Sequence, residues 1–258
     1  NGWEKGTVPL QNEDLTLREW YFDGEHYWVS AVNKDGSDCA GDGGYAQTTR
    51  YCRVANAEIN WSRCGRGLPC ATVAASEVPE AVQVVQDLFM SPVFRVYRSD
   101  DIKGVEYGGA LKNIMALACG VLDGIGLGDN SRAALMTRGL VEMTRFGVHF
   151  GAQMTTFFGL SGMGDLVCTC TSVHSRNHTA GMMMAEGKTA KEITEGTNMI
   201  VEGIRTARLV HDIAVREHID MPITEEVCHL IDGDHTALEA LEALMRRAKK
   251  AESETYPM

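Results

Sequence analysis

The period of hydrophobic and polar residues changes along this chain. Residues 70–76 (CATVAAS) form an apolar run of strand length, and residues 94–99 (FRVYRS) alternate like a half-buried strand. Between them, residues 79–90 (PEAVQVVQDLFM) carry apolar residues at helical spacing after a proline, which suits a first helical turn. The order strand, helix, strand predicts a βαβ unit of a parallel sheet.

Beyond residue 100 the strand pattern disappears and helical spacing takes over. The pattern predicts helices at about 101–122, 131–149, 154–160, 177–186, 189–195, 200–217, 224–232 and 236–250. We expect Asn130 and Ser131 to cap the second helix, and Thr224 to cap the helix that begins with Glu225 and Glu226. The sequence therefore predicts a fragment of α/β structure followed by an all-helical domain.

Residues 1–60 differ from the rest in composition. All four tryptophans lie within residues 1–61, and residues 33–47 (NKDGSDCAGDGGYAQ) are rich in Gly and Asp without a sustained period. Such a segment favours loop or weak structure. We place a boundary near residue 60.

Charge and composition exclude several classes of function. The 258 residues carry a net charge of -11, which disfavours non-specific attraction to nucleic acid or to an anionic membrane. No apolar run approaches the ~20 residues that span a bilayer, and the first residues contain no apolar signal core, so we expect neither membrane insertion nor export. The eight cysteines are scattered without a CxxC spacing, which favours reduced thiols and a cytoplasmic location.

A single charge, that of Lys112, interrupts residues 108–122 (GGALKNIMALACGVL). On a helix, its neighbours three and four positions away are small or apolar: Gly108, Gly109, Met115 and Ala116. Two interpretations stay open. The side chain extends along its own methylenes to solvent, or its amine is buried beside a cleft, where desolvation favours the neutral form that a general base needs. Asn113 points about 100° further round the helix and serves another contact.

Residues 159–178 (GLSGMGDLVCTCTSVHSRNH) are the second stretch with candidate chemistry, and they contain one acid, Asp165. Ser175, Arg176 and Asn177 offer a hydroxyl, a guanidinium and an amide in a row, a set that can bind phosphate at the start of a helix. The other interpretation is an ordinary N-cap followed by a surface arginine.

The same stretch contains four residues of zinc-ligand type: Cys168, Cys170, His174 and His178. However, CxC is a poor chelating spacing, and residues 167–171 have the β-branched pattern of a strand, which would splay alternate side chains. We expect no metal site.

Several segments, in the same order, resemble the bacterial-type NAD(P)-dependent glycerol-3-phosphate dehydrogenases. The likeness runs from about residue 66 to 250. It rests on GLPCATVAAS (67–76), FRVYRSDD (94–101), the segment from GVEYGGALKN to MTRFG (104–147), GLSGMGDLVCTCTS (159–172), SRN (175–177), VEGIRT (201–206) and MPITEEV (221–227). A ketopantoate reductase-like protein would share a Lys-Asn helix, but SRN and MPITEEV argue against it.

The resemblance implies an α/β remnant of a doubly wound (Rossmann-type) sheet, followed by an all-α substrate domain of the 6-phosphogluconate dehydrogenase C-terminal-like type. Residues 1–60 stay unassigned, residues 61–100 would be the remnant of the nucleotide-binding domain, and residues 101–258 the helical substrate domain. The implied reaction interconverts sn-glycerol 3-phosphate and dihydroxyacetone phosphate with NAD or NADP. It would supply glycerol 3-phosphate for phospholipid synthesis, and the chain would form a homodimer.

The resemblance also implies roles for single residues. Lys112 would take the proton from the C2 hydroxyl, or return it in the reducing direction. Asp165 would orient this lysine or the substrate hydroxyls. The implied substrate-binding residues are Lys112, Asn113, Asp165, Thr169, Ser175, Arg176 and Asn177, and the implied cofactor-binding residues are Arg176, Ile200 and Glu202.

The chain departs from this family where the cofactor's pyrophosphate should bind. It contains no GxGxxG, and residues 124–130 (GIGLGDN) lack both the third glycine and a preceding strand. Two functions therefore stay open. The chain is either a dehydrogenase, or an inactive fragment or variant that has lost cofactor binding and acts as a helical dimerisation and phosphate-binding module.

Overall fold

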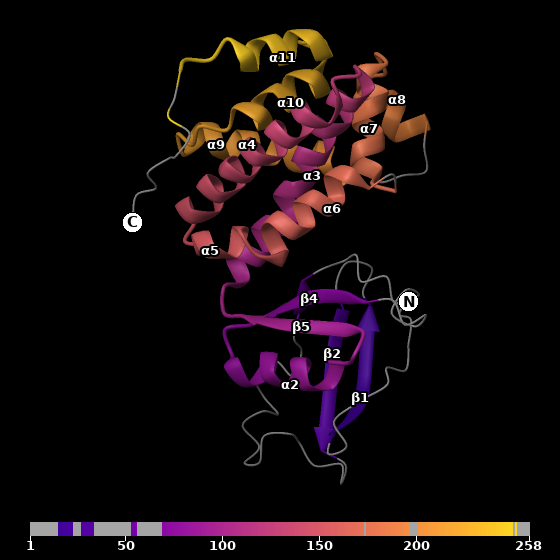
Figure 1. The fold of residues 1–258 in the computed structure, drawn as a ribbon, viewed down its shortest axis with the longest axis vertical. Coiled ribbons are helices and arrows are strands. Elements are labelled where there is room, and N and C mark those ends of the chain that lie inside the picture. The colour runs from indigo at the N-terminus through magenta and orange to yellow at the C-terminus, as the bar shows by residue number, and fades with distance from the viewer. Residues whose placement is uncertain are drawn as a thin grey trace. The chain divides into compact units, whose positions relative to one another are not determined.

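The fold was determined as a computed structural model of the chain. It describes the backbone of residues 15–22, 27–33 and 53–55, and both backbone and side chains of residues 69–172, 174–196, 201–249 and 251. The chain divides into two compact units, Asn1–Val105 and Glu106–Met258, which Figure 1 shows as a mixed α/β unit and a helical unit. This agrees with the predicted fold class.

The first unit contains the predicted βαβ unit. Strands β4 (Cys70–Ala75) and β5 (Phe94–Ser99) are parallel, and helix α2 (Pro79–Phe89) connects them. The short strand β3 (Arg53–Ala55) pairs antiparallel with β4, so β4 is central in this three-stranded sheet. The prediction of strand, helix and strand is confirmed.

Residues before 60 also form strands, which the sequence pattern did not identify. Strand β1 (Leu15–Phe22) pairs antiparallel with β2 (Tyr27–Asn33), with an irregularity between Leu17 and Glu19. The glycine-rich segment for which a loop was expected lies, except for Asn33, outside the described residues.

The second unit is helical, and α3 begins just before it. The elements are α3 (Ile102–Gly124), α4 (Gly128–His149), α5 (Met154–Phe157), the π-helix η2 (Leu160–Gly164), α6 (Asp165–Thr171), α7 (Arg176–Ala185), α8 (Ala190–Gly196), α9 (Glu202–Arg216), α10 (Pro222–Asp232) and α11 (Ala237–Met245). The predicted helices are confirmed, although residues 154–160 divide between a short α-helix and a π-helix. None of the described helices is long and apolar enough to cross a membrane.

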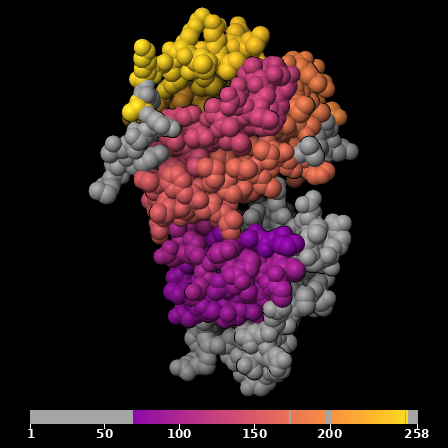
Figure 2. All heavy atoms as spheres, viewed as in Figure 1, coloured from indigo at the N-terminus to yellow at the C-terminus, as the bar shows by residue number. Residues whose placement is uncertain are grey.

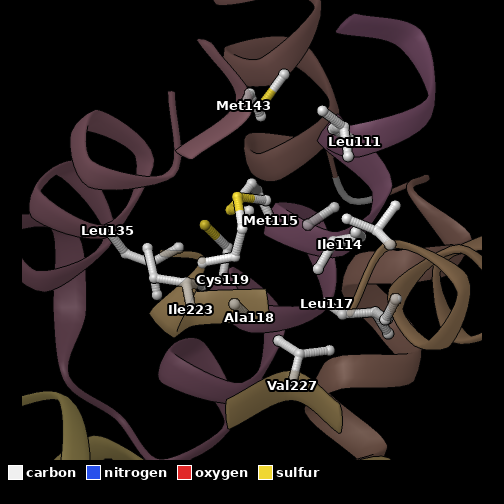
Figure 3. Close-up of a cluster of buried hydrophobic side chains, with 14 of the residues drawn as sticks. Leu111, Ile114, Met115, Leu117, Ala118, Cys119, Leu135, Met143, Ile223 and Val227 are labelled. Carbon is white, nitrogen blue, oxygen red and sulfur yellow. The ribbon is translucent and has the colours of Figure 1, made fainter. Parts of the chain in front are cut away.

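Helix α3 is the centre of the helical unit. Every residue from 111 to 122 is buried, so the helix is enclosed on all sides and needs no polar face. In Figure 3 its residues Leu111, Met115 and Cys119 lie among side chains of α4 and α10. In Figure 2 the yellow atoms of the C-terminal helix region lie directly beside the pink atoms of α4.

Helix α7 packs unusually close to α3 because glycines meet at the contact. A Cβ on Gly120 would lie 2.0 Å from the carbonyl oxygen of His178, and a Cβ on Gly181 would lie 2.1 Å from that of Leu117. Real Cβ atoms do not approach so closely, so both positions require glycine. The short distance between the two backbones brings Asn113 and Asn177 within reach of each other.

Two predicted helix caps are wrong. Helix α4 begins at Gly128, so Asn130 and Ser131 already lie within its first turn. Helix α10 begins at Pro222, and Thr224 is its third residue.

The cap of α10 comes from another helix. The buried Glu142 carboxylate of α4 accepts hydrogen bonds from the backbone N–H of Ile223 (2.6 Å) and from the N–H and hydroxyl of Thr224 (3.2 and 3.3 Å). It thereby satisfies N–H groups that a helix start leaves without an intrahelical partner. Burial raises the pKa of Glu142 to about 7, against the effect of these hydrogen bonds and of Arg145.

Candidate active site in the helical unit

Lys112 and Asp165 form a buried ion pair. The Lys112 Nζ lies 2.7 Å from the Asp165 Oδ2, and each side chain is 8% exposed. The interpretation in which the lysine extends to solvent is therefore wrong. The charge of Lys112 is instead buried beside the opposite charge of Asp165. A buried charge requires such a partner, because water no longer solvates it.

The pair can form because the backbones of α3 and η2 touch one helical turn earlier. A Cβ on Gly108 would lie 2.2 Å from the carbonyl oxygen of Ser161, so only glycine fits there. Lys112 follows Gly108 by four residues, and Asp165 follows Ser161 by four. The close contact thus places the two charged side chains opposite each other. A Cβ on Gly109, in contrast, would meet no described atom within 4 Å.

Asp165 and Thr169 lie on the same face of α6. The Thr169 hydroxyl donates to the Asp165 backbone carbonyl at 2.7 Å and lies 3.5 Å from the Asp165 Oδ1, and both residues are buried. The prediction of a strand at residues 167–171 is wrong, because α6 covers them. Among the described residues no group of three His, Cys, Asp or Glu side chains is placed to hold a metal ion.

Asn113 belongs to a second network, separate from the Lys112 pair. Its Oδ1 accepts a hydrogen bond of 2.9 Å from the Asn177 Nδ2. Asn177 Oδ1 in turn accepts from the backbone N–H of Gly203 at 2.9 Å. The Asn113 Nδ2 faces the Gly109 carbonyl at 3.4 Å and the Glu202 Oε2 at 3.5 Å, both at the long limit of a hydrogen bond. These contacts join α3, α7 and the start of α9.

The side chains of Ser175, Arg176 and Asn177 have different environments. Ser175 is the N-cap of α7, and its hydroxyl accepts from the His178 N–H at 3.3 Å. Arg176 is exposed and has no ion pair with any described residue. Asn177 is buried in the network with Asn113. Ile200 lies outside the described residues, and Glu202 is the exposed first residue of α9.

The structure adds two residues that the sequence did not indicate. Ser161 is 7% exposed, and its hydroxyl has no hydrogen-bond partner among the described residues, although it lies one turn from Asp165. Gly203 supplies the N–H that holds Asn177. Neither residue type carries a signal in the sequence, because glycine and serine are common at surfaces and turns.

Comparisons with known proteins match the helical unit over most of its length. The family model described as the C-terminus of NAD-dependent glycerol-3-phosphate dehydrogenase matches residues 101–242. A glycerol-3-phosphate dehydrogenase (NAD(P)+) from Clostridium perfringens is 51% identical over 187 residues, which cover 72% of this chain and 56% of that protein. Its counterpart in Moorella thermoacetica is 49% identical over 191 residues, covering 74% and 57%. The chain thus spans slightly more than half the length of these relatives.

A solved structure agrees with the sequence comparison. Glycerol-3-phosphate dehydrogenase from Coxiella burnetii superimposes with a TM-score of 0.68 and is 39% identical, covering 72% of this chain and 57% of that one. The enzyme from Saccharomyces cerevisiae gives a TM-score of 0.66 at 27% identity, covering 74% and 57%. Both structures therefore cover about the same share of the chain as the sequence relatives do.

Proposed function

This chain belongs to the family of NAD-dependent glycerol-3-phosphate dehydrogenases, and we propose that its helical unit carries out proton transfer at the C2 oxygen of glycerol 3-phosphate and dihydroxyacetone phosphate. The observation that carries the proposal is the ion pair of Lys112 and Asp165. A buried lysine beside a buried acid is expensive to maintain for stability alone, and paired titratable groups of this kind gather at catalytic sites.

Lys112 is the proton donor and acceptor in this proposal. In the reducing direction its ammonium donates a proton to the C2 carbonyl oxygen, and in the oxidising direction the amine removes the proton of the C2 hydroxyl. Asp165, 2.7 Å away, stabilises the ammonium and holds it in one direction. Thr169 fixes the acid, since its hydroxyl lies against both the backbone and the side chain of Asp165.

Arg176 is the proposed contact for the anionic end of the ligand. It is exposed at the first position of α7, where the helix dipole and the free N–H groups also favour an anion. Ser175 and Asn177 stay predictions as direct phosphate contacts, because their side chains already make hydrogen bonds within the protein.

NAD or NADP is the proposed cofactor, and hydride transfer is the chemistry that it supplies when bound. Two described residues are suited to hold part of it: Arg176 by its charge, and Glu202 by a carboxylate that can accept from hydroxyl or amide groups. The turn between β4 and α2 is not suited to a pyrophosphate, because it contains no glycine and Pro79 lacks an N–H. Contact of Ile200 with the cofactor stays a prediction, because this residue lies outside the described part of the chain.

The remaining proposals concern the whole protein. We expect a homodimer in the cytoplasm that supplies glycerol 3-phosphate for phospholipid synthesis. The scattered cysteines without a CxxC spacing support a reducing compartment. Light scattering after size-exclusion chromatography measures the oligomeric state directly, and a monomer would contradict the proposed dimer.

Fluorescence titration with NADH, with and without dihydroxyacetone phosphate, tests the proposed function. Saturable NADH binding that tightens with the substrate, followed by NADH oxidation, is the expected result. Binding of dihydroxyacetone phosphate without any binding of NADH up to millimolar concentration would instead favour the second candidate, a phosphate-ester-binding module. The absence of a suitable turn between β4 and α2 is the observation that keeps this second candidate open.

A further inference from the structure

Helix α11 has apolar residues on more sides than a helix at a protein surface needs. Seven of its nine residues are Ala, Leu or Met, and only Glu239 and Glu242 are polar. A helix that is apolar all round normally lies inside a protein. Helix α11 instead packs against α10 at the outside of the helical unit (Figure 1), and part of its apolar surface remains exposed to solvent.

The exposed part of α11 is a stripe of three large apolar residues. Leu238 is 65% exposed and Met245 is 78% exposed, and these are the two most exposed large hydrophobic side chains among the described residues. They are seven residues apart, which is about two helical turns, so they lie on the same face at opposite ends of the helix. The half-buried Leu241 lies between them. Spacings of three and four residues are those by which helices pair along an apolar stripe.

The stripe of Leu238, Leu241 and Met245 fits a second copy of itself. A contact related by a two-fold axis uses the same patch on both copies, so the patch must be complementary to itself. Leu238 and Met245 lie equally far from the middle of α11. An antiparallel second copy would therefore place its own Met245 against Leu238, and its own Leu238 against Met245.

The charges of α11 favour the same direction. Glu239 lies in the first turn of the helix, and Arg246 is its C-cap residue. In an antiparallel pair the Glu239 of each copy comes beside the Arg246 of the other, whereas a parallel pair would bring like charges together. Glu242, near the middle, already forms an ion pair with Arg246 of its own helix, which reduces its repulsion of the second Glu242.

We propose that a second copy of this chain covers α11, through an antiparallel contact between the two stripes of Leu238, Leu241 and Met245. That the chain forms a homodimer at all rests on the proposed function, and the new claim is the surface at which the two copies meet. Each copy contributes one short helix, so the interface is smaller than that of a permanent dimer. We therefore expect a dimer that dissociates in the micromolar range.

Sedimentation velocity of the full chain, from about 1 μM to about 1 mM, measures this dimer. Leu238→Glu should raise its Kd by at least about 100-fold, because each dimer carries the change twice and loses the burial of two large apolar side chains. Leu209→Glu is the matched control, since Leu209 is 60% exposed but lies on α9, outside the stripe. Its Kd should stay within about twofold of the unchanged chain.

The outcomes separate this inference from the proposed homodimer, and none of them depends on the binding of NADH or substrate. If the chain is dimeric and Leu238→Glu leaves the Kd unchanged, or Leu209→Glu raises it as much, the two copies meet elsewhere. The inference is then overturned while the homodimer stands. A chain that stays monomeric at every concentration contradicts both.

A disulfide tests the antiparallel direction. In the double variant Leu238→Cys with Met245→Cys, the two thiols of one helix are about 10 Å apart, too far for a bond within one copy. Between antiparallel copies they face each other, so mild oxidation should give a covalent dimer on a non-reducing gel. Each single variant should form no more dimer than the unchanged chain, whose exposed Cys168 sets the background. Equal cross-linking of a single variant, or none in the double variant, would overturn the antiparallel contact.

Discussion

Glu142→Gln should change how the stability of the helical unit depends on pH. Glu142 is 2% exposed, and burial raises its pKa to about 7, whereas an unfolded glutamate titrates near 4.5. The native state therefore binds more protons than the unfolded state between these two values. The stabilisation from this proton is fully present below about pH 4.5 and is lost as the pH rises through about 7.

The size of the effect follows from the two pKa values. A difference of about 2.5 pKa units corresponds to about 3 kcal/mol of unfolding free energy, at 1.36 kcal/mol per unit. Glutamine has nearly the same shape and does not titrate. Its oxygen can accept from Ile223, but its amide group would face the N–H of Thr224, so a constant cost of about 1–3 kcal/mol is expected in addition.

Urea unfolding, followed by far-UV circular dichroism at pH 4.5, 5.5, 6.5 and 7.5, measures this difference. The stability of the unchanged chain relative to Glu142→Gln should fall by about 3 kcal/mol across the series and then level off. Glu195→Gln, an exposed glutamate on α8, is the control and should run parallel to the unchanged chain. If the unfolding free energy of Glu142→Gln also ran parallel to that of the unchanged chain across this pH range, the reasoning would be refuted. They would mean that the N–H groups of α10 keep this carboxylate ionised throughout.

Two further changes test the contact that brings Lys112 and Asp165 together. Gly108→Ala places a Cβ 2.2 Å from the Ser161 carbonyl oxygen, so it should lower the melting temperature by several degrees and weaken dihydroxyacetone phosphate binding. A Cβ at Gly109 would meet no described atom within 4 Å, so Gly109→Ala causes no steric clash and should change neither quantity. Equal effects of the two alanines would contradict the proposed role of the contact. Ser161→Ala removes a buried hydroxyl without a described partner, so urea unfolding should show unchanged or higher stability, by up to about 1–2 kcal/mol; a clear loss would mean that the hydroxyl is bonded after all.

The sequence predicted the features that depend on local period and on isolated charge. The βαβ unit and the helices from residue 101 onward, except α6, follow from hydrophobic spacing, since helix and strand periods differ strongly. Lys112 was identified as the one charge in an apolar stretch. Its burial was one of two open interpretations, because a helix of the same sequence on a surface would let the lysine reach solvent.

The strand predicted at residues 167–171 fails for a local reason. Val167, Thr169 and Thr171 alternate with cysteines and thus imitate a strand. In the structure the two threonine hydroxyls donate to backbone carbonyls four residues earlier, at 2.7 and 2.8 Å, a contact that exists only in a helix. The π-helix η2 ends at Gly164, directly before α6 begins at Asp165.

The caps of α9 and α10 could not be predicted because they are tertiary contacts. Glu142 is separated from Thr224 by 82 residues, and Asn177 from Gly203 by 26. Nothing in the segments around Val201 or Met221 indicates which side chain will meet their N–H groups. The sequence therefore identified Asn177 only as a ligand contact, by its place in the Ser175, Arg176, Asn177 set and by resemblance, whereas its hydrogen bonds show that it also holds α9.

The measurement that tests the central claim most directly compares turnover and binding in Lys112→Ala. The rate of NADH oxidation with dihydroxyacetone phosphate should fall by a factor of about 10² to 10⁴, the contribution of a general acid, while the affinity for dihydroxyacetone phosphate stays within a few fold of the unchanged chain. Asp165→Asn, which keeps the shape of the partner, should lose less of the rate. Equal loss of turnover and binding in Lys112→Ala would contradict the account, because Lys112 would then hold the ligand or the fold rather than transfer a proton.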